Sequence, residues 1–301
     1  MNPTYSAQTV LQTARGPFLI LAPVCVLAGV AAALLQPDVQ LNWLSLALIL
    51  AGALAAHISV NMLNEYLDFR SGLDLNTQRT PFSGGSGALP GDPAAAKAVL
   101  VGGIATLVLT GLIGLYFLAS GAWGLLPLGL AGLIVIVTYT RQINRSPWLC
   151  LVAPGFGFGL AMVAGSGYAL GAADSPALWL AALLTFFLVN NLLLLNQYPD
   201  IEADKAVGRY HFPIAYGVEK STRMYALFVL GAALSVVVGV VGGWFPLWSL
   251  LALLPLLLSV KALSGARQLG AAIGTQPQFM AANVMATLAT PTVLGLTLLL
   301  G

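Results

Sequence analysis

The chain has 301 residues, of which 58% are hydrophobic and only 7% charged, and its mean hydropathy is +0.90. This composition excludes an ordinary soluble domain and indicates a polytopic membrane protein. The net charge of +2 says little about partners, and two cysteines, Cys25 and Cys150, suggest neither a disulfide framework nor a metal cluster.

Nine stretches are long and apolar enough to cross a bilayer, which takes about 20 residues of helix. They are continuously apolar, whereas the strands of a membrane barrel alternate between polar and apolar residues. We therefore predict an all-α bundle of nine transmembrane helices in which residues 1–301 form a single domain. The predicted spans are residues 17–35, 41–63, 97–118, 121–140, 148–170, 176–198, 222–243, 245–263 and 279–300.

All twelve basic residues fall in the segments on one side of these spans. The opposite connections, "QPDVQL", "ASGAWG", "LGAADSPA" and "GGWFPL", contain no Lys or Arg. The positive-inside rule therefore predicts a cytoplasmic N-terminus and a C-terminus on the other side. The basic residues are Arg15, Arg70, Arg79, Lys97, Arg141, Arg145, Lys205, Arg209, Lys220, Arg223, Lys261 and Arg267.

Two connections on the cytoplasmic side are much longer than the others. They cover about residues 64–96 and 196–221. Loops of this length are usually functional or disordered, and we name these two segments the first and second caps. Within the first loop, Asp92 followed by Pro93 predicts the N-cap of the next helix.

Polar residues recur at helical spacing in both caps. In the second cap, Asn196, Asp200 and Asp204 are four residues apart and would line one face of a helix. In the first, Asn64 and Asp68 are also four apart.

The polar residues of the first cap continue as a stripe along the preceding membrane span. His57 and Asn61 continue the stripe of Asn64 and Asp68 toward the membrane interior, and Asp74 follows further along the cap. The sequence therefore predicts a polar stripe that ends at the cytoplasmic mouth of the bundle.

Clustered carboxylates need a cation or a base, because burial and mutual repulsion disfavour their charged form. Carboxylate and amide oxygens suit Mg²⁺, which commonly bridges protein carboxylates to phosphate oxygens. Basic residues near the clusters could hold the remaining phosphate oxygens. Taken alone, each acidic loop is most simply interpreted as a set of solvated charges that fix the membrane topology. The matching spacing of acids and amides in two loops instead favours a shared metal site.

The glycine runs and the pair His57 and Asn61 can also be interpreted as elements of helix packing. The glycine runs "PGFGFG" and "AGSG" favour close helix packing over a phosphate loop. For His57 and Asn61, helix-helix hydrogen bonding is as reasonable as a ligand role.

At "NEYLDFRSGLD" and "NQYPDIEADKAVGR" the sequence resembles the UbiA superfamily of membrane prenyltransferases, most of all its 1,4-dihydroxy-2-naphthoate prenyltransferase branch. The resemblance implies a helical bundle around a central cavity that two acidic loops cap. It implies Mg²⁺ as cofactor, held by metal ligands at Asn64, Asp68, Asp74, Asn196, Asp200 and Asp204. Asp68 and Asp200 would be catalytic, and diphosphate-binding bases would be Arg79, Arg141, Lys205 and Arg209.

The sequence departs from the family pattern at a few places. Glu65 stands where the naphthoate branch usually has Asp, which should keep a ligand but lengthen its reach. His211, in "RYHFPIAYG", has no counterpart that we can assign, and Pro199 should end or kink the helix before Asp200.

The expected activity is transfer of a polyprenyl group from its diphosphate to an aromatic or quinone-precursor acceptor, within a bacterial or archaeal cytoplasmic membrane and facing the cytoplasm. Partners would be these two substrates and membrane lipid, with no nucleic acid and no obligate protein partner. Another acceptor, such as a glycerol-phosphate lipid or a haem, or cyclisation of the prenyl chain, stays open within the same fold. A cation transporter is the alternative outside it, and it predicts acids near the bilayer midplane.

Overall fold

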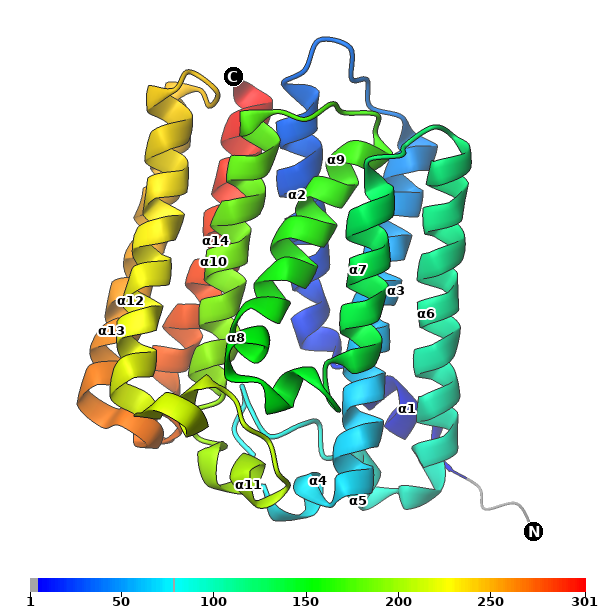
Figure 1. Cartoon of the computed structure of the whole chain (residues 1–301), viewed down its shortest axis with the longest axis vertical. Coiled ribbons are helices and arrows are strands. Elements are labelled where there is room, and N and C mark those ends of the chain that lie inside the picture. The colour runs from blue at the N-terminus through cyan, green and yellow to red at the C-terminus, as the bar shows by residue number, and fades with distance from the viewer. Residues whose placement is uncertain (1–4, 78) are drawn as a thin grey trace.

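The computed structural model describes residues 5–77 and 79–301 and contains no β-strand in that part of the chain. Long helices run side by side as one bundle, with short helices gathered at the end where the chain begins (Figure 1). The predicted all-α membrane bundle is therefore confirmed. In chain order the elements are α1 (Ala7–Thr13), η1 (Gly16–Ile20), α2 (Leu21–Leu34), α3 (Trp43–Ser71), α4 (Leu73–Asn76), α5 (Ala88–Gly91), η2 (Pro93–Ala95), α6 (Ala96–Ala119), α7 (Leu125–Thr138), η3 (Ile143–Arg145), α8 (Pro147–Gly155), the π-helix η4 (Phe156–Ala164), α9 (Gly165–Ala169), α10 (Pro176–Asn196), α11 (Ile201–Ala206), α12 (Phe212–Val241), η5 (Leu247–Ala252), α13 (Leu253–Leu269), η6 (Gly270–Thr275) and α14 (Pro277–Leu300).

Eight helical segments of the described chain are long and apolar enough to cross a membrane, against the nine that we predicted. The difference is α7, which has 14 residues where the sequence predicted 20 at 121–140. A turn at Gly121, with φ of 98°, delays its start. Helix α1 and the end of α14 nevertheless lie at opposite ends of the bundle (Figure 1), so the chain between them passes through the bundle an odd number of times and α7 supplies the remaining passage.

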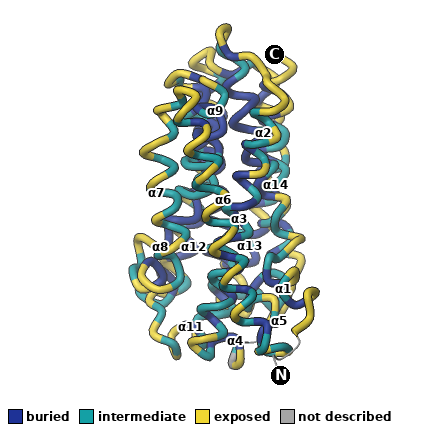
Figure 2. The backbone as a smooth tube through the Cα atoms, turned by 90° about the vertical axis from the view of Figure 1, so that its right-hand side faces the viewer, coloured by how far each residue is buried: buried dark blue, intermediate teal, exposed yellow. Residues whose placement is uncertain are grey.

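The exposure of apolar side chains supports the membrane assignment. The largest buried cluster contains side chains of α2, η4, α10 and α14. Large apolar residues such as Leu254 and Val241 point outward and are exposed, and exposed residues run along the outer faces of the long helices (Figure 2). Water would disfavour such a surface, whereas lipid tails accommodate it.

Several helix ends differ from the predicted spans because hydropathy detects only the lipid-embedded part of a helix. Helix α3 continues to Ser71 and ends at Gly72, whose φ of 80° stops it. Helix α10 ends at Asn196, so Asn196, Asp200 and Asp204 do not share one continuous helix as predicted. Instead, Pro199 lies in the turn between the helices, as expected, and Asp200 is the N-cap of α11.

The helix start at Asp92 was correctly predicted, but its side chain has another partner. Asp92 occupies the N-cap position without a capping hydrogen bond from its carboxylate. That carboxylate accepts hydrogen bonds from the Ser6 backbone N–H at 2.9 Å and from the Thr9 hydroxyl at 3.0 Å. It therefore fastens α1 against the first cap.

The glycine run in "PGFGFG" packs one helix against another, as predicted. A side chain at Gly155 or Gly159 would collide with the backbone of α10 at Phe186. The Asn190 side chain of α10 also accepts a hydrogen bond from the Gly155 N–H at 2.6 Å. These contacts hold the α8–η4 segment close to α10, beside the centre of the bundle.

Candidate active site

Two cavities meet near the end of the bundle where α4 and α11 lie. The smaller has a volume of about 120 Å³ and polar walls, and the larger has a volume of about 590 Å³ and mostly apolar walls. Six residues line both cavities: Arg15, Asn64, Phe82, Tyr139, Leu193 and Asn196. We name them the polar cavity and the apolar chamber, and their shared walls make them one continuous site.

All six predicted metal ligands line the polar cavity, although they come from two caps that are distant in the sequence. Helix α3 supplies two of them, α4 one, the end of α10 one, and α11 with its N-cap the other two. They are Asn64, Asp68, Asp74, Asn196, Asp200 and Asp204. The two motifs therefore face each other across a single cavity, and the role of each residue as a ligand stays a prediction.

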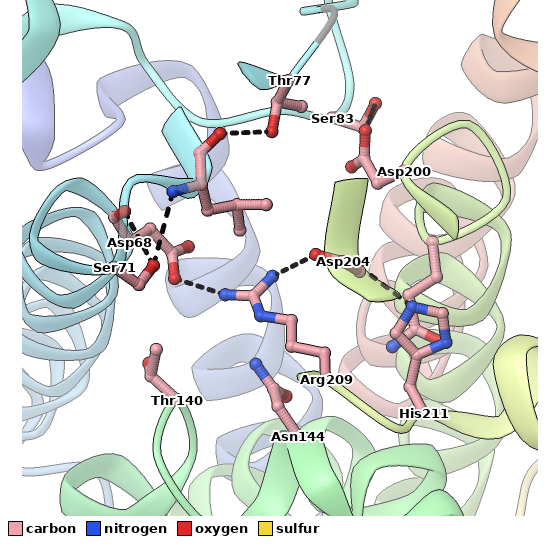
Figure 3. Close-up of polar contacts among 12 residues, drawn as sticks. Asp68, Ser71, Thr77, Ser83, Thr140, Asn144, Asp200, Asp204, Arg209 and His211 are labelled. Carbon is pink, nitrogen blue, oxygen red and sulfur yellow. Dashed lines mark hydrogen bonds and ion pairs between the residues drawn. The ribbon is translucent and has the colours of Figure 1, made fainter. Parts of the chain in front are cut away.

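Arg209 joins the two motifs (Figure 3). Its guanidinium pairs with Asp68 of the first motif and, at 2.7 Å, with Asp204 of the second. The second oxygen of Asp204 lies 3.0 Å from Nε2 of His211, which is buried. Arg209 thus places one positive charge between carboxylates that would otherwise repel each other.

Asn64 is oriented by hydrogen bonds on both ends of its amide. Its Nδ2 donates to Asp68 at 3.0 Å, and its Oδ1 accepts from the Thr140 hydroxyl at 2.9 Å. Because Asn64 and Asp68 are one helical turn apart on α3, this bond turns both side chains toward the same cavity.

Asp74 and Asp200, the other two acids of the polar cavity, make weaker contacts with the protein. Burial raises the pKa of Asp74 to about 7, and the charges of Asp68 and Glu65 act in the same direction. Burial and the charge of Asp204 likewise raise the pKa of Asp200 to about 7. Ser83 donates to Asp200 across a long 3.4 Å contact. A bound cation would favour the charged form of both carboxylates.

The donor atoms suit a hard divalent cation. Oδ2 of Asp74 and Oδ1 of Asn196 are buried and have no hydrogen-bond partner, a condition that costs about 1–3 kcal/mol per group. Both residues line the polar cavity, and carboxylate and amide oxygens are the ligands that Mg²⁺, Ca²⁺ and Mn²⁺ prefer. In residues 5–77 and 79–301, however, no three Asp, Glu, His or Cys side chains converge into a ready metal centre.

The four predicted diphosphate-binding bases lie in different surroundings. Arg209 lines the polar cavity. Nη2 of Arg79 donates to the Asp74 carbonyl at 3.1 Å, and its guanidinium lies against Gly87. Arg141 and Lys205 are exposed and line neither cavity.

Glu65 binds a base and a cap residue. Its buried carboxylate lies 3.1 Å from Nε of Arg15 and accepts hydrogen bonds from the backbone N–H and the hydroxyl of Ser86, at 2.7 and 2.6 Å. These contacts fix the first cap and the N-terminal segment to α3, and Glu65 is absent from the walls of both cavities.

Arg15 belongs to the site, although from the sequence we interpreted it only as one of the basic residues that set the membrane topology. It has left-handed backbone angles (φ 57°, ψ 52°) between α1 and η1, which is uncommon for a residue other than glycine. Its Nε pairs with Glu65, and its side chain borders both cavities. Arg15 therefore places a positive charge where the polar cavity opens into the apolar chamber.

The apolar chamber is lined by α3, α6, α7 and η4 and contains few polar side chains. One of them is His57, which is 5% exposed and packs edge-on against the Phe158 ring at 4.7 Å. Its Nδ1 has no hydrogen-bond partner. The chamber can hold a long apolar group whose charged end lies in the polar cavity.

A family model described as the UbiA prenyltransferase family matches residues 22–297. The 1,4-dihydroxy-2-naphthoate octaprenyltransferase of Bacillus subtilis (strain 168) is 28% identical over 297 residues, which cover 98% of this chain and 92% of that protein.

Solved structures share the fold. The apo structure of a UbiA homolog from Aeropyrum pernix K1 matches with a TM-score of 0.69 at 16% identity, covering 94% of this chain and 98% of that one. A UbiA homolog from Archaeoglobus fulgidus, bound to DMAPP and Mg²⁺, matches with a TM-score of 0.61 at 16% identity, covering 93% of this chain and 98% of that one.

Proposed function

This chain belongs to the UbiA prenyltransferase family and is an integral, multi-pass membrane prenyltransferase; we propose that it transfers a polyprenyl group from its diphosphate to 1,4-dihydroxy-2-naphthoate or a similar aromatic acceptor, with Mg²⁺ as cofactor. The choice of acceptor rests on the relative from Bacillus subtilis, whose name specifies 1,4-dihydroxy-2-naphthoate. The choice of metal rests on the oxygen donors of the polar cavity and on the Mg²⁺ bound to the Archaeoglobus fulgidus homolog.

The observation that carries the proposal is the continuity of the two cavities. A polyprenyl diphosphate has a strongly charged end and a long apolar tail. The polar cavity with its acids and bases suits the charged end through a bridging metal, and the 590 Å³ apolar chamber suits the tail. The shared walls at Arg15 and Asn64 would then lie beside the bond that breaks.

The six oxygen-donor side chains would hold Mg²⁺ from both motifs: Asn64, Asp68, Asp74, Asn196, Asp200 and Asp204. Bound there, Mg²⁺ would neutralise charge on the diphosphate and make it a better leaving group. Asp68 and Asp204 pair with Arg209 in this structure, so a metal held by these carboxylates would compete with the guanidinium for them. Arg209 would then be free to pair with a diphosphate oxygen.

Arg15 and the apolar walls complete the chemistry. As the diphosphate departs, the guanidinium of Arg15 can stabilise negative charge at the junction of the two cavities. The allylic cation left behind needs an electron-rich carbon nearby and no water. The apolar side chains of the chamber exclude water from it, and an aromatic acceptor that enters the chamber supplies the carbon that attacks. That carbon must then lose either a proton, which the departed diphosphate can accept, or its carboxyl group as CO₂.

Topology supports a cytoplasmic active site. The short helices α4, α5 and α11 and the predicted caps at 64–96 and 196–221 lie at the end of the bundle where the chain begins (Figure 1). The basic residues also cluster in the connections that the positive-inside rule assigns to the cytoplasm. We place this end at the cytoplasmic face and treat the whole chain as a single domain. Acids gathered at one end also disfavour a transporter, whose sites usually lie near the midplane.

The test is product formation by the purified protein in lipid vesicles, supplied with geranylgeranyl diphosphate, 1,4-dihydroxy-2-naphthoate and Mg²⁺ and analysed by mass spectrometry. We expect a prenylated naphthoate that requires Mg²⁺ and that Asp68→Ala and Asp200→Ala abolish. Asp174→Ala is the matched control and should keep activity, because Asp174 is an exposed acid that lines neither cavity. A cyclic hydrocarbon released without acceptor would instead identify a terpene cyclase, and ion flux without turnover a transporter.

A further inference from the structure

His57 is a polar side chain in the wall of the apolar chamber that has no hydrogen-bond partner within residues 5–77 and 79–301. It belongs to α3 and is only 5% exposed. From the sequence, a helix-helix hydrogen bond was an open alternative for both His57 and Asn61. Asn61 makes a contact of this kind, because its Nδ2 donates to the Ala14 carbonyl at 2.9 Å, whereas His57 makes none. A buried imidazole without a hydrogen bond is unfavourable, so its place in the chamber calls for a ligand.

Other polar side chains of the chamber are already satisfied by the protein. The Thr110 hydroxyl donates to the Thr106 carbonyl at 2.9 Å, and the Ser166 hydroxyl donates to the Met162 carbonyl at 2.6 Å. The Asn64 amide is bonded at both ends. His57 therefore offers the chamber a hydrogen-bonding group that the fold itself does not use.

The position of His57 decides which part of the substrates it can meet. It lies seven residues before Asn64 on α3, which is about 10 Å deeper in the membrane, and it does not line the polar cavity that suits the diphosphate. The prenyl tail is a hydrocarbon and has no group that forms a hydrogen bond. Of the two proposed substrates, this leaves the aromatic acceptor, which carries hydroxyl groups.

The surroundings of His57 suit a planar aromatic molecule. Its ring meets the Phe158 ring edge to face, with the centroids 4.7 Å apart, and both residues line the chamber. Gly157, which precedes Phe158, also lines the chamber, and a Cβ atom there would meet no heavy atom within 4 Å. Open space thus adjoins an aromatic wall, against which another ring can pack.

The two nitrogens of the imidazole are not equally available. Nδ1 is fully buried, so His57 can meet a ligand only through Nε2. A phenolic hydroxyl both donates and accepts a hydrogen bond, so it suits Nε2 in either tautomer of the neutral ring. In 1,4-dihydroxy-2-naphthoate the 1-hydroxyl lies next to the carboxylate and can donate to it within the molecule. The 4-hydroxyl has no such internal partner and needs one from the protein.

We propose that Nε2 of His57 forms a hydrogen bond with the 4-hydroxyl of the acceptor and makes the protein select naphthoates that carry a free hydroxyl at that position. The proposal rests on the proposed function, because it takes the acceptor to be a dihydroxynaphthoate. His57 is then a specificity-determining residue in the apolar chamber, separate from the residues that line the polar cavity.

The test measures the Kd of 1,4-dihydroxy-2-naphthoate and of 1-hydroxy-2-naphthoate, which lacks the 4-hydroxyl. The assay is equilibrium dialysis under argon with purified protein in detergent micelles, and empty micelles serve as the blank. His57→Leu should raise the Kd of 1,4-dihydroxy-2-naphthoate by about tenfold, or about 1.4 kcal/mol, and should leave that of 1-hydroxy-2-naphthoate unchanged. The thermal midpoint of His57→Leu should not fall, because the change removes a buried polar group that has no partner.

Two further variants show whether the effect belongs to the hydrogen bond. His57→Gln places an amide near the position of Nε2 and should keep most of the preference for 1,4-dihydroxy-2-naphthoate. Thr106→Val is the matched control, because it also removes a polar group from a membrane helix. The Thr106 hydroxyl bonds only to carbonyls of its own helix and lines neither cavity, so this variant should leave both Kd values unchanged.

The outcomes separate this proposal from the proposed function. If the unchanged protein binds 1,4-dihydroxy-2-naphthoate but His57→Leu leaves its Kd unchanged, the contact with His57 is wrong and the proposed function stands. The same conclusion follows if His57→Leu weakens the binding of both naphthoates equally, because the effect then does not involve the 4-hydroxyl. If the unchanged protein binds neither naphthoate, the proposed acceptor is wrong and the contact with His57 fails with it.

Discussion

Replacing Arg209 by methionine should destabilise the metal-free protein and make Mg²⁺ a stronger stabiliser of the variant than of the unchanged protein. The guanidinium pairs with Asp68 and Asp204, and the side chains of the three residues are only 15%, 9% and 4% exposed in that order. Solvent therefore screens the pairs weakly. Removing one partner of a buried ion pair costs about 3–5 kcal/mol, because the opposite charge is left without compensation.

We expect the lower end of that range, about 3 kcal/mol, because buried carboxylates can take up a proton in part compensation. For a chain of this size the loss corresponds to a fall of about 6 °C in the thermal midpoint. Mg²⁺ should raise the thermal midpoint of the variant by more degrees than it raises that of the unchanged protein, since Arg209 no longer competes for Asp68 and Asp204. Arg209→Lys keeps a positive charge, so its thermal midpoint should lie between those of Arg209→Met and the unchanged protein.

The assay is thermal unfolding in detergent micelles with and without Mg²⁺. Arg223→Met is the matched control, because Arg223 pairs with Glu219 on the surface, where the two side chains are 74% and 80% exposed, and such pairs contribute little. An equal Mg²⁺ response in Arg209→Met and the unchanged protein would refute the reasoning, because Arg209 would then not compete with the metal.

Two further substitutions test the packing around the site. Gly159→Ala should lower the thermal midpoint because its Cβ would collide with the α10 backbone, whereas Gly157→Ala should not; equal midpoints would contradict this assignment of the two glycines. Glu65→Ala should destabilise the protein by about 1–3 kcal/mol, because it leaves Ser86 and Arg15 without their acceptor. Hydrogen exchange should then rise in the first cap and in residues 5–15, and unchanged exchange there would show that Glu65 does not fasten these segments.

The transmembrane spans could be predicted because a lipid environment demands continuous apolar helices. The helix ends could not, because they depend on local geometry beyond the lipid. Gly72 ends α3 eight residues past the predicted span. Helix α12 begins at Phe212, ten residues before its predicted span, and continues through a non-helical residue at Gly217.

The six residues that line the polar cavity as predicted ligands could be picked out in the sequence, because acids and amides recur in both caps in a pattern that resembles the family's motifs. Their partners were not, because contacts between distant segments leave no local pattern. Arg209 and Asp68 are 141 positions apart. The pairing of Arg15 with Glu65 likewise joins the N-terminal segment to α3, which is why Arg15 was missed and Glu65 was read as a ligand with a longer reach.

The central claim is that both acidic motifs bind one metal-bound diphosphate together. The most direct measurement is the affinity of geranylgeranyl diphosphate, in the presence of Mg²⁺, for Asp68→Ala, Asp200→Ala and the double variant. The account predicts that each single change costs about 2–5 kcal/mol of binding free energy and that the double variant loses little more than either, because the motifs act as a unit. Full additivity of the two losses, or binding that survives both changes, would contradict it.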